Sequence, residues 1–426
     1  MGEREQSLEK HLVDILHGVA CRGNRRRAPC RSQNLPIPTA SPNEQPMIRV
    51  AIIDDSPFVQ RLLTAYLSRA RGVQVIGAVG DADAAIELVA RTQPDVITLG
   101  VEMPNIQGTE LLGLLQLASE KSAVVMVTGV SRRAAATTLE ALRLGAQDFH
   151  LKFTAEAPVE PEVWERELLS KVRAAHQRRQ PRAVSQAVVA KSKPPITPPP
   201  RSLRPPVASV VSRPLTTSPQ RVMMIGGSTG GITAMERILD DLDPATSDAY
   251  IIVQHLPAAF TQSLMHQLQG RTSLPIEEAR HGTALASGRI YLTPGGCHLR
   301  LAQPTPRGAV HIELEDGPAI NGHLPCIDAT MQSAAALLGP RAVGILLSGM
   351  GSDGANGIAA IHAAGGDTMA QDASTCVIFG MPQRAIERQA VNFIGTPEQI
   401  ARRINRVSQT SRNVSSETPA PAGVTE

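Results

Sequence analysis

Aromatic residues, an excess of one charge and long apolar runs are all lacking in this sequence of 426 residues. Aromatics make up 2% of the chain, which argues against a base-stacking surface for nucleic acid. Lys and Arg number 42 against 39 Asp and Glu, and this near-balance argues against a dedicated nucleic-acid or membrane-surface protein. Apolar runs such as Val343–Leu347 are far shorter than the roughly 20 residues that span a bilayer, so we expect no membrane insertion.

Cysteines are few, odd in number and without CxxC spacing, which disfavours both a disulfide framework and a zinc site. They are Cys21, Cys30, Cys297, Cys326 and Cys376. The chain opens on the charged residues Glu3, Arg4 and Glu5, so we expect no secretory signal. With 42% hydrophobic residues, these features predict a cytoplasmic protein of two or three domains, and we expect no metal and no cofactor.

Three segments have the composition of unfolded chain. Residues 1–46 combine a basic cluster with several prolines and lack sustained periodicity, so we predict a disordered extension and hypothesise that translation starts at Met47. Residues 177–220 are rich in Pro, Ser, Arg and Lys, which predicts a semi-extended linker rather than a site for an anionic partner. Residues 408–426 are predicted to be a disordered tail.

Two α/β patterns occupy the remaining chain, over residues 48–176 and 221–407. The first alternates five strands with five helices, which implies a doubly wound parallel sheet of flavodoxin-like order. Its predicted strands are Ile48–Ile53, Val73–Ala78, Val96–Leu99, Ala123–Val127 and Asp148–Leu151. The second is a larger doubly wound domain, with predicted strands at Val222–Ile225, Tyr250–Val253, Arg289–Leu292 and Ala342–Leu347 and a β-hairpin at Gln303–Gly317.

A glycine-rich turn after a strand is the most informative segment of the second pattern. Its letters are Gly226-Gly-Ser228-Thr-Gly-Gly231, and glycines permit a sharp turn that presents Ser228 beside outward-pointing N–H groups. That geometry suits a nucleophile whose oxyanion is stabilised by backbone donors. A Walker loop is excluded because Ile232 stands in place of its lysine, and Ser228 breaks the dinucleotide fingerprint. For this motif alone, a non-catalytic anion pocket stays open as the alternative.

Two further strand ends supply the partners of a Ser-His-Asp set. His255 closes the apolar run that begins at Tyr250, and Asp353 lies in the glycine-rich turn after Leu347. Parallel strands gather their carboxyl ends at one edge of a sheet, so we predict Ser228 as nucleophile, His255 as base and Asp353 as orienting carboxylate. Taken alone, one histidine is more often structural, and an Asp in such a turn is often a helix cap. The other histidines are interpreted as surface or packing residues: His266, His281, His298, His311 and His362.

Residues 48–407 resemble the chemotaxis response-regulator protein-glutamate methylesterases of the CheB type. The resemblance rests on Ile225–Gly231, Gln254–Pro257 with Phe260-Thr261, Leu347–Gly354, and Gln371-Asp through Phe379–Pro382. It implies a receiver, a linker and an esterase domain, with backbone N–H groups near Thr229 and Met350 as the oxyanion hole. Cys326 stands where the family usually has a serine, a departure that we expect to change little.

The resemblance also implies a reaction and partners. The reaction is hydrolysis of glutamyl methyl esters on the cytoplasmic domains of methyl-accepting chemoreceptors, with release of methanol, and many members also deamidate glutamine. A chemotaxis histidine kinase is the implied partner of the receiver-like domain in two-component signalling.

One position of the receiver-like domain departs from the family's pattern. Asp54 and Asp55 match the acidic pair, Thr128 the hydroxyl and Lys152 the lysine of phospho-receivers. Gly100 stands at the phosphoacceptor position, and since glycine has no carboxylate, no aspartyl phosphate is expected there. Gln107 and Phe153 depart from the pattern as well, which favours a pseudo-receiver. We therefore hypothesise a docking module or constitutive lid whose inhibition is weak or is relieved by a partner.

Two other classes of function stay in view. A catalytically silent two-domain scaffold would have no need of Ser228, His255 and Asp353 together, and a nucleotide-binding regulator is disfavoured by the spacing of the glycines. Substitution of Ser228 by alanine separates an esterase from both.

Overall fold

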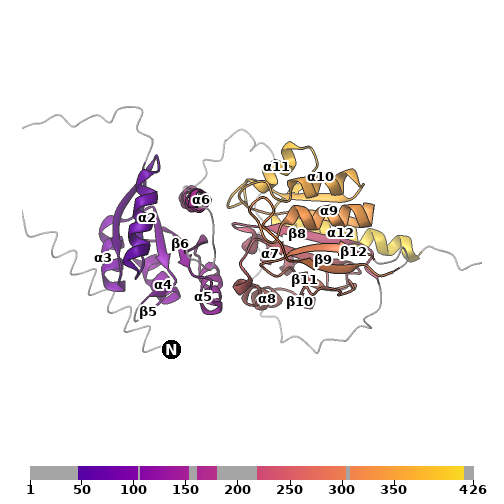
Figure 1. Cartoon of the computed structure of the whole chain (residues 1–426), viewed down its shortest axis with the longest axis horizontal. Helices are drawn as coiled ribbons and strands as arrows, with labels where there is room; N and C mark the ends of the chain where they lie inside the picture. The colour runs from indigo at the N-terminus through magenta and orange to yellow at the C-terminus, as the bar shows by residue number, and fades with distance from the viewer. Residues whose placement is uncertain (1–46, 104–105, 153–160, 180–217, 304–307, 417–426) are drawn as a thin grey trace, which may run out of the picture.

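Two parallel sheets, each covered by helices on both faces, make up the described part of the chain (Figure 1). A computed structural model describes residues 47–103, 106–152, 161–179, 218–303 and 308–416. The predicted extension 1–46, most of the predicted linker and residues 417–426 lie outside these residues, as do Cys21, Cys30 and Phe153. No helix among the described residues has the length and apolar character needed to cross a bilayer.

The first sheet has five strands in the order β2-β1-β3-β6-β7, all parallel, which confirms the predicted flavodoxin-like order. Its strands are β1 (Ile48–Ile53), β2 (Val73–Val79), β3 (Val96–Gly100), β6 (Ala123–Thr128) and β7 (Asp148–Leu151). Its helices are α2 (Pro57–Arg69), α3 (Ala82–Thr92), α4 (Gly108–Ala118), α5 (Arg132–Arg143) and α6 (Pro161–Arg179). A short antiparallel pair, β4 (Glu102–Met103) with β5 (Ile106–Gln107), follows β3.

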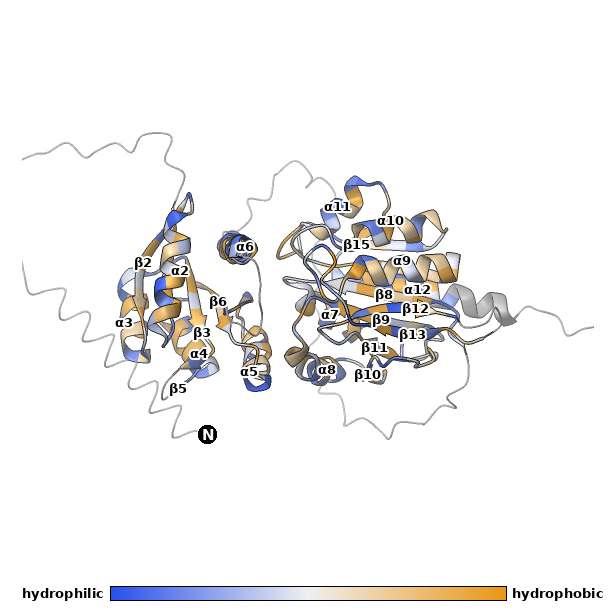
Figure 2. Ribbon diagram, viewed as in Figure 1, coloured by the Kyte–Doolittle hydropathy of each residue, from blue (hydrophilic) through white to orange (hydrophobic). Residues whose placement is uncertain are grey.

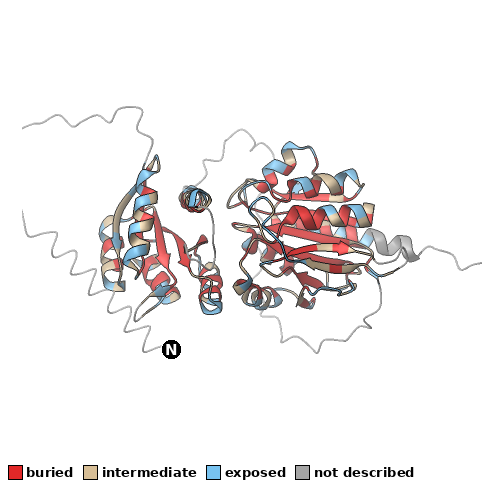
Figure 3. Cartoon of the chain, in the orientation of Figure 1, coloured by how far each residue is buried: buried red, intermediate tan, exposed pale blue. Residues whose placement is uncertain are grey.

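The alternation of side chains along β1 explains the two helical layers. Val50 and Ile52 pack with α2 and α6, whereas Ala51 and Ile53 pack on the other face with α3, α4 and α5. All four side chains are fully buried. The inner strands of both sheets are apolar and buried, as Figures 2 and 3 show, because parallel strands covered on both faces meet no water. The edge strand β2 is mostly half-buried or exposed.

The second sheet has seven parallel strands in the order β10-β11-β9-β8-β14-β15-β16. Its strands are β8 (Val222–Gly227), β9 (Ala249–Gln254), β10 (Ile276–Glu278), β11 (Ile290–Leu292), β14 (Ala342–Leu346), β15 (Asp367–Gln371) and β16 (Phe393–Gly395). Its helices are α7 (Gly231–Asp240), α8 (Thr261–Gln269), α9 (Ile327–Leu338), α10 (Ala355–Ala363), α11 (Met381–Glu387) and α12 (Pro397–Ser416), with short 3-10 turns η2 (Ala258–Phe260) and η3 (Gly339–Arg341). Helices α9, α10 and α11 cover one face, and α7, α8 and α12 the other.

Two boundaries in the esterase-type half differ from the sequence prediction. Helix α12 continues to Ser416, so the prediction of a disordered tail from residue 408 is wrong for residues 408–416. Ser408 is buried and its hydroxyl donates to Asp248, and no Pro or Gly interrupts the helical pattern before Pro419. The hairpin is formed by β12 (His298–Ala302) and β13 (His311–Glu315), so its first strand precedes the predicted range.

The two halves pack against each other through apolar side chains. Phe149 of β7 stacks on Phe260 of η2, with ring centroids 5.2 Å apart and planes 15° from parallel. Helices α5 and α8 also lie side by side where the two halves meet (Figure 1). This contact brings the beginning of β7 to the carboxyl edge of the second sheet.

Candidate active site

The turn after β8 places Ser228 at the carboxyl edge of the second sheet. Gly230 has φ +76°, a left-handed conformation, and a Cβ there would lie 2.1 Å from Val377 Cγ2. The Ser228 carbonyl accepts hydrogen bonds from Gly231 N and Gln254 Nε2, both at 2.9 Å. These constraints fix the Ser228 backbone at the N-terminus of α7.

The next strand delivers His255 to the same edge. Gly227 and Gln254 are register partners in β8 and β9, so Ser228 and His255 are the next residue on each strand. Ser228 also lies against the turn that carries the predicted carboxylate, because a Cβ on Gly349 would lie 2.8 Å from Ser228 Cβ. The structure therefore gathers the three sequence-predicted residues at one place.

His255 and Asp353 form a direct pair, with His255 Nε2 2.8 Å from Asp353 Oδ2. Burial raises the pKa of Asp353, but His255 and the backbone donors around the carboxylate outweigh burial and hold that pKa well below its usual range. An ionised carboxylate only accepts, so the Nε2 proton of His255 points at Asp353. In neutral His255 the other ring nitrogen, Nδ1, is then an acceptor, and it has no hydrogen-bond partner among the described residues.

The N-terminus of α9 supports the carboxylate. Asp353 accepts from Ile327 N (2.8 Å), Asp328 N (2.9 Å), Gly354 N (3.0 Å) and Cys326 Sγ (3.1 Å) in addition to His255. Unpaired N–H groups at a helix N-terminus favour a negative charge. The fold therefore keeps Asp353 charged although the residue is almost completely buried.

Two neighbours of the pair were missed by the sequence analysis. Cys326 was expected to matter little, yet its thiol donates directly to Asp353, and burial with nearby Asp353 raises the thiol's pKa to about 12. His323 was not considered, yet its ring stacks on that of His255. Both residues lie in His323-Leu-Pro-Cys-Ile-Asp328, the segment that leads into α9. Its position directly before a helix N-terminus is the sequence feature that could have pointed to both residues.

The predicted oxyanion donors also lie at this edge. Thr229 follows Ser228 and is buried, and Met350 follows Gly349 in the turn after β14. The backbone N–H groups of Thr229 and Met350 make no hydrogen bond within the described part of the chain. They are therefore available to a ligand, as an oxyanion hole requires.

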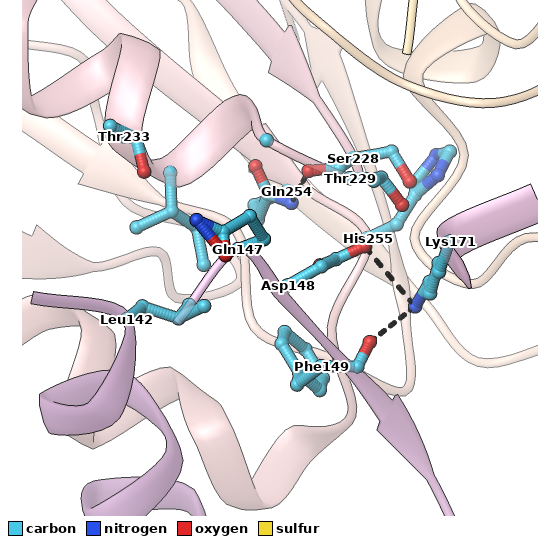
Figure 4. A pocket seen from close by; sticks show the side chains of 12 residues that line it. Leu142, Gln147, Asp148, Phe149, Lys171, Ser228, Thr229, Thr233, Gln254 and His255 are labelled. Atoms are coloured by element: carbon cyan, nitrogen blue, oxygen red, sulfur yellow. Dashed lines mark hydrogen bonds and ion pairs between the residues drawn. The ribbon is translucent and has the colours of Figure 1, made fainter. Parts of the chain in front are cut away.

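The receiver-like half covers the Ser228 edge. Ser228, Thr229 and His255 line a cavity of about 40 Å³ together with Asp148 and Lys171 (Figure 4). Small-molecule sites commonly measure roughly 300–1,000 Å³, so this cavity admits water but no substrate side chain. In this conformation the space beside Ser228 and His255 is closed to a substrate.

Asp148 is the charged group that β7 inserts at this closure. Its side chain is 7% exposed and its Oδ2 lies 3.9 Å from Lys171 Nζ, while Lys171 donates to the Phe149 carbonyl (2.5 Å). Asp148 Oδ2 has no hydrogen-bond partner among the described residues. Burial raises the pKa of Asp148, and the charge of Lys171 opposes this rise only in part.

The receiver pocket contains an internal ion pair. Lys152 Nζ lies 3.0 Å from Asp54 Oδ2 and 3.9 Å from Asp55 Oδ1. The Thr128 hydroxyl accepts from Thr138 (2.8 Å) and donates to the Gly129 carbonyl (3.2 Å). A Cβ on Gly100 would lie 2.7 Å from Asp54 Oδ2, so the Asp54 carboxylate occupies space beside the missing side chain. The structure brings together Asp54, Asp55 and Lys152.

Comparison with known proteins finds a matching family for each half of the chain. Residues 223–404 match the family model of the CheB methylesterase, and residues 50–159 match the response regulator receiver domain. A protein-glutamate methylesterase/protein-glutamine glutaminase of Xanthomonas euvesicatoria is 38% identical over 366 residues, which cover 86% of this chain and 98% of that protein. This chain belongs to the CheB methylesterase family.

Further relatives and solved structures are similar to this chain. A protein-glutamate methylesterase/protein-glutamine glutaminase of Koribacter versatilis is 35% identical over 82% of this chain and 92% of its own. Among solved structures, the Thermotoga maritima CheB methylesterase catalytic domain is 32% identical, with a TM-score of 0.43 over 44% of this chain and 98% of that domain. The response regulator domain of Thermotoga maritima CheB is 36% identical, with a TM-score of 0.28 over 31% of this chain and 97% of that domain.

Proposed function

We propose that the chain hydrolyses glutamyl γ-methyl esters of chemoreceptor cytoplasmic domains through Ser228, His255 and Asp353. The observation that carries the proposal is the 2.8 Å pair between His255 and Asp353 beside the Ser228 turn. This pair leaves His255 Nδ1 free to accept the proton of the Ser228 hydroxyl. Membership of the methylesterase family supports the same chemistry.

The reaction proceeds in two steps, acylation of Ser228 and hydrolysis of the acyl-serine. Ser228 Oγ bonds to the ester carbonyl carbon while His255 Nδ1 takes the hydroxyl proton, and the Thr229 and Met350 N–H groups receive the oxyanion. Collapse of the intermediate breaks the bond to methoxide, which takes the proton from His255 and leaves as methanol. Water then attacks the acyl-serine by the same route, which releases the glutamate and restores Ser228. Throughout, Asp353 holds the ring of His255.

The glutaminase part of the relatives' names requires only a different leaving group. A glutamine side chain would pass through the same tetrahedral geometry and release ammonia instead of methanol, with His255 again supplying the proton. We therefore extend the proposal to receptor glutamines whose side chains can reach Ser228 when the two halves are apart.

Regulation follows from the closed cavity. We infer that the receiver-like half is a lid on the Ser228 edge and that a protein partner, such as a chemotaxis histidine kinase, opens it. Gly100 offers no carboxylate for phosphorylation, and Lys152 is already paired with Asp54. Acetyl phosphate should therefore leave the rate of ester hydrolysis unchanged.

Methanol release from a methylated receptor tests the reaction. The full chain should release methanol above the receptor-alone blank, and Ser228→Ala should abolish the release without changing thermal unfolding. Ser228 makes no side-chain hydrogen bond among the described residues, so its loss should not weaken the fold. Equal release by the two chains would overturn the proposal.

A further inference from the structure

A second histidine lies flat against the proposed base. The rings of His255 and His323 have centroids 4.0 Å apart and planes only 11° from parallel. Such a separation is face-to-face van der Waals contact between two imidazoles. The two residues are 68 positions apart in the chain (323 − 255), so the tertiary fold creates the contact.

His255 needs a contact of this kind because only one of its ring atoms is held. Its Nε2 bonds to Asp353, and its Nδ1 has no partner among the described residues. One hydrogen bond lets an imidazole tilt about that bond, and tilting moves Nδ1 away from the Ser228 hydroxyl. A flat ring against one face opposes the tilt without occupying Nδ1.

His323 is itself held in place by its own backbone. Its N–H donates to the Ile320 carbonyl (3.0 Å) and its carbonyl accepts from Ile320 N (3.1 Å). Three residues later the chain reaches Cys326 and then α9, whose first N–H groups bond to Asp353. The segment from Ile320 to Ile327 therefore contacts both members of the pair.

His323 also stays uncharged while His255 gains a proton. Burial, with His255 as the next cause, lowers the pKa of His323 to about 4, and the charge of Asp353 opposes this only in part. A second cation stacked at this distance would repel the imidazolium that forms on His255 during the reaction. A neutral ring avoids that repulsion.

We propose that His323 is a positioning residue that holds the ring plane of His255 through face-to-face stacking. The proposal rests on the proposed function, since it assigns His255 the role of base. His323 does not act as the base itself, because the orienting carboxylate bonds to His255. What His323 supplies is a flat, neutral surface.

Variants of the full chain test the proposal. His323→Phe keeps a flat, uncharged ring, His323→Ala removes it, and His362→Ala, on the exposed end of α10, is the matched control. We expect His323→Ala to lower kcat by about 10²-fold with little change in KM, the scale of a small misplacement of a reacting group. His323→Phe should recover most of kcat, and His362→Ala should match the unsubstituted chain.

A readout independent of turnover accompanies the kinetics. Ring ¹⁵N NMR of His255 in the full chain should give one sharp set of signals in the unsubstituted protein and in His323→Phe, and broadened or multiple signals in His323→Ala. Thermal unfolding shows whether each variant is folded, and the NMR spectrum assigns any loss of kcat to the ring.

Other results would overturn either the positioning role of His323 or the proposed function, and the experiment distinguishes the two. Unchanged kcat and unchanged His255 signals in His323→Ala would refute the positioning role. An equal loss of kcat in the Ala and Phe variants would refute it too, because the imidazole nitrogens would then be required. If neither the unsubstituted chain nor Phe149→Asp, which weakens the contact between the halves, releases Ser228-dependent methanol, the proposed function fails, and the NMR signals alone decide the role of His323.

Discussion

Asp353 is a charged carboxylate that lies almost completely buried in the site, where water cannot stabilise its charge. Its low pKa means that folding favours the charged form, so the stability that Asp353 contributes is present above the ordinary carboxyl pKa. That stability is lost as the pH falls through the still lower pKa of the folded state. Near neutral pH the carboxylate is ionised, and the His255 tautomer is fixed.

Substitution Asp353→Asn should remove most of the activity. An amide in place of the carboxylate can donate to His255 Nε2, which favours the wrong tautomer and puts the ring proton on Nδ1. We expect kcat to fall by about 10⁴-fold, the size of the effect in serine proteases. Steady-state methanol release measures it, and a loss below tenfold would contradict the role of Asp353.

Cys326 gives a second test at this scale. Cys326→Ala removes a thiol that bonds to Asp353. Cys297→Ala removes a buried thiol whose hydrogen bond within the described residues is a long one, 3.7 Å, to the Pro294 carbonyl. The first variant should lower the free energy of unfolding by about 1 kcal/mol more than the second, since one charge-assisted donor is lost. Cys326→Ser should retain both stability and activity. Equal losses in the two alanine variants, measured by urea unfolding, would show that the thiol does not support Asp353.

Among the elements, the strands and the order of the first sheet followed from the sequence more fully than the contacts did. The order of the second sheet and its strands β10, β15 and β16 were not predicted. Alternating strand and helix patterns are local, and the carboxyl-edge rule then placed Ser228, His255 and Asp353 together. The stack of His323 on His255 joins distant segments, and no local pattern marks it. Helix α12 continues past its predicted end, where Ser408 is buried, although the residues after Ser408 are mostly weak helix formers.

The end of β3 yields a prediction about the receiver pocket. Gly100→Asp adds a third carboxylate against Asp54 and Asp55, and its Cβ displaces Asp54 Oδ2 from its present place. We expect unfolding to become easier by about 1–3 kcal/mol without divalent cations, and Mg²⁺ to restore part of the loss. Gly100→Ala, which adds the Cβ without the charge, is the control and should show no Mg²⁺ dependence. If both variants respond alike to Mg²⁺ in thermal unfolding, the added charge is not the cause.

For the whole molecule, the proposed lid makes access to Ser228 depend on the contact between the two halves. Phe149→Asp places a charge against Phe260 and should weaken the closed arrangement, so the rate of methanol release should rise several-fold at fixed receptor concentration. The exposed Phe58→Asp on α2 is the control and should leave the rate unchanged. A rate that does not rise in Phe149→Asp would mean that the closed arrangement does not limit the reaction.

The same contact should depend on pH through Asp148. Burial raises the pKa of Asp148 in the closed arrangement, and opening returns the carboxyl to water and to its usual pKa. Protonation therefore favours closure, and closure weakens as the pH rises from the usual carboxyl pKa through the raised value. Relative to Asp148→Asn, which cannot ionise, the unsubstituted chain should open more readily across that window, as measured at each pH by hydrogen–deuterium exchange of the segments around Phe149 and Phe260. Identical pH profiles for the two chains would contradict this account.

The most direct test of the central claim is methanol release from a methylated receptor by the full chain, with Ser228→Ala beside it and acetyl phosphate present or absent. We predict release that requires Ser228 and does not change with acetyl phosphate, because the serine performs the hydrolysis and Gly100 cannot be phosphorylated. Release that persists in Ser228→Ala would contradict the catalytic assignment. A large acceleration by acetyl phosphate would contradict the account of the receiver-like half.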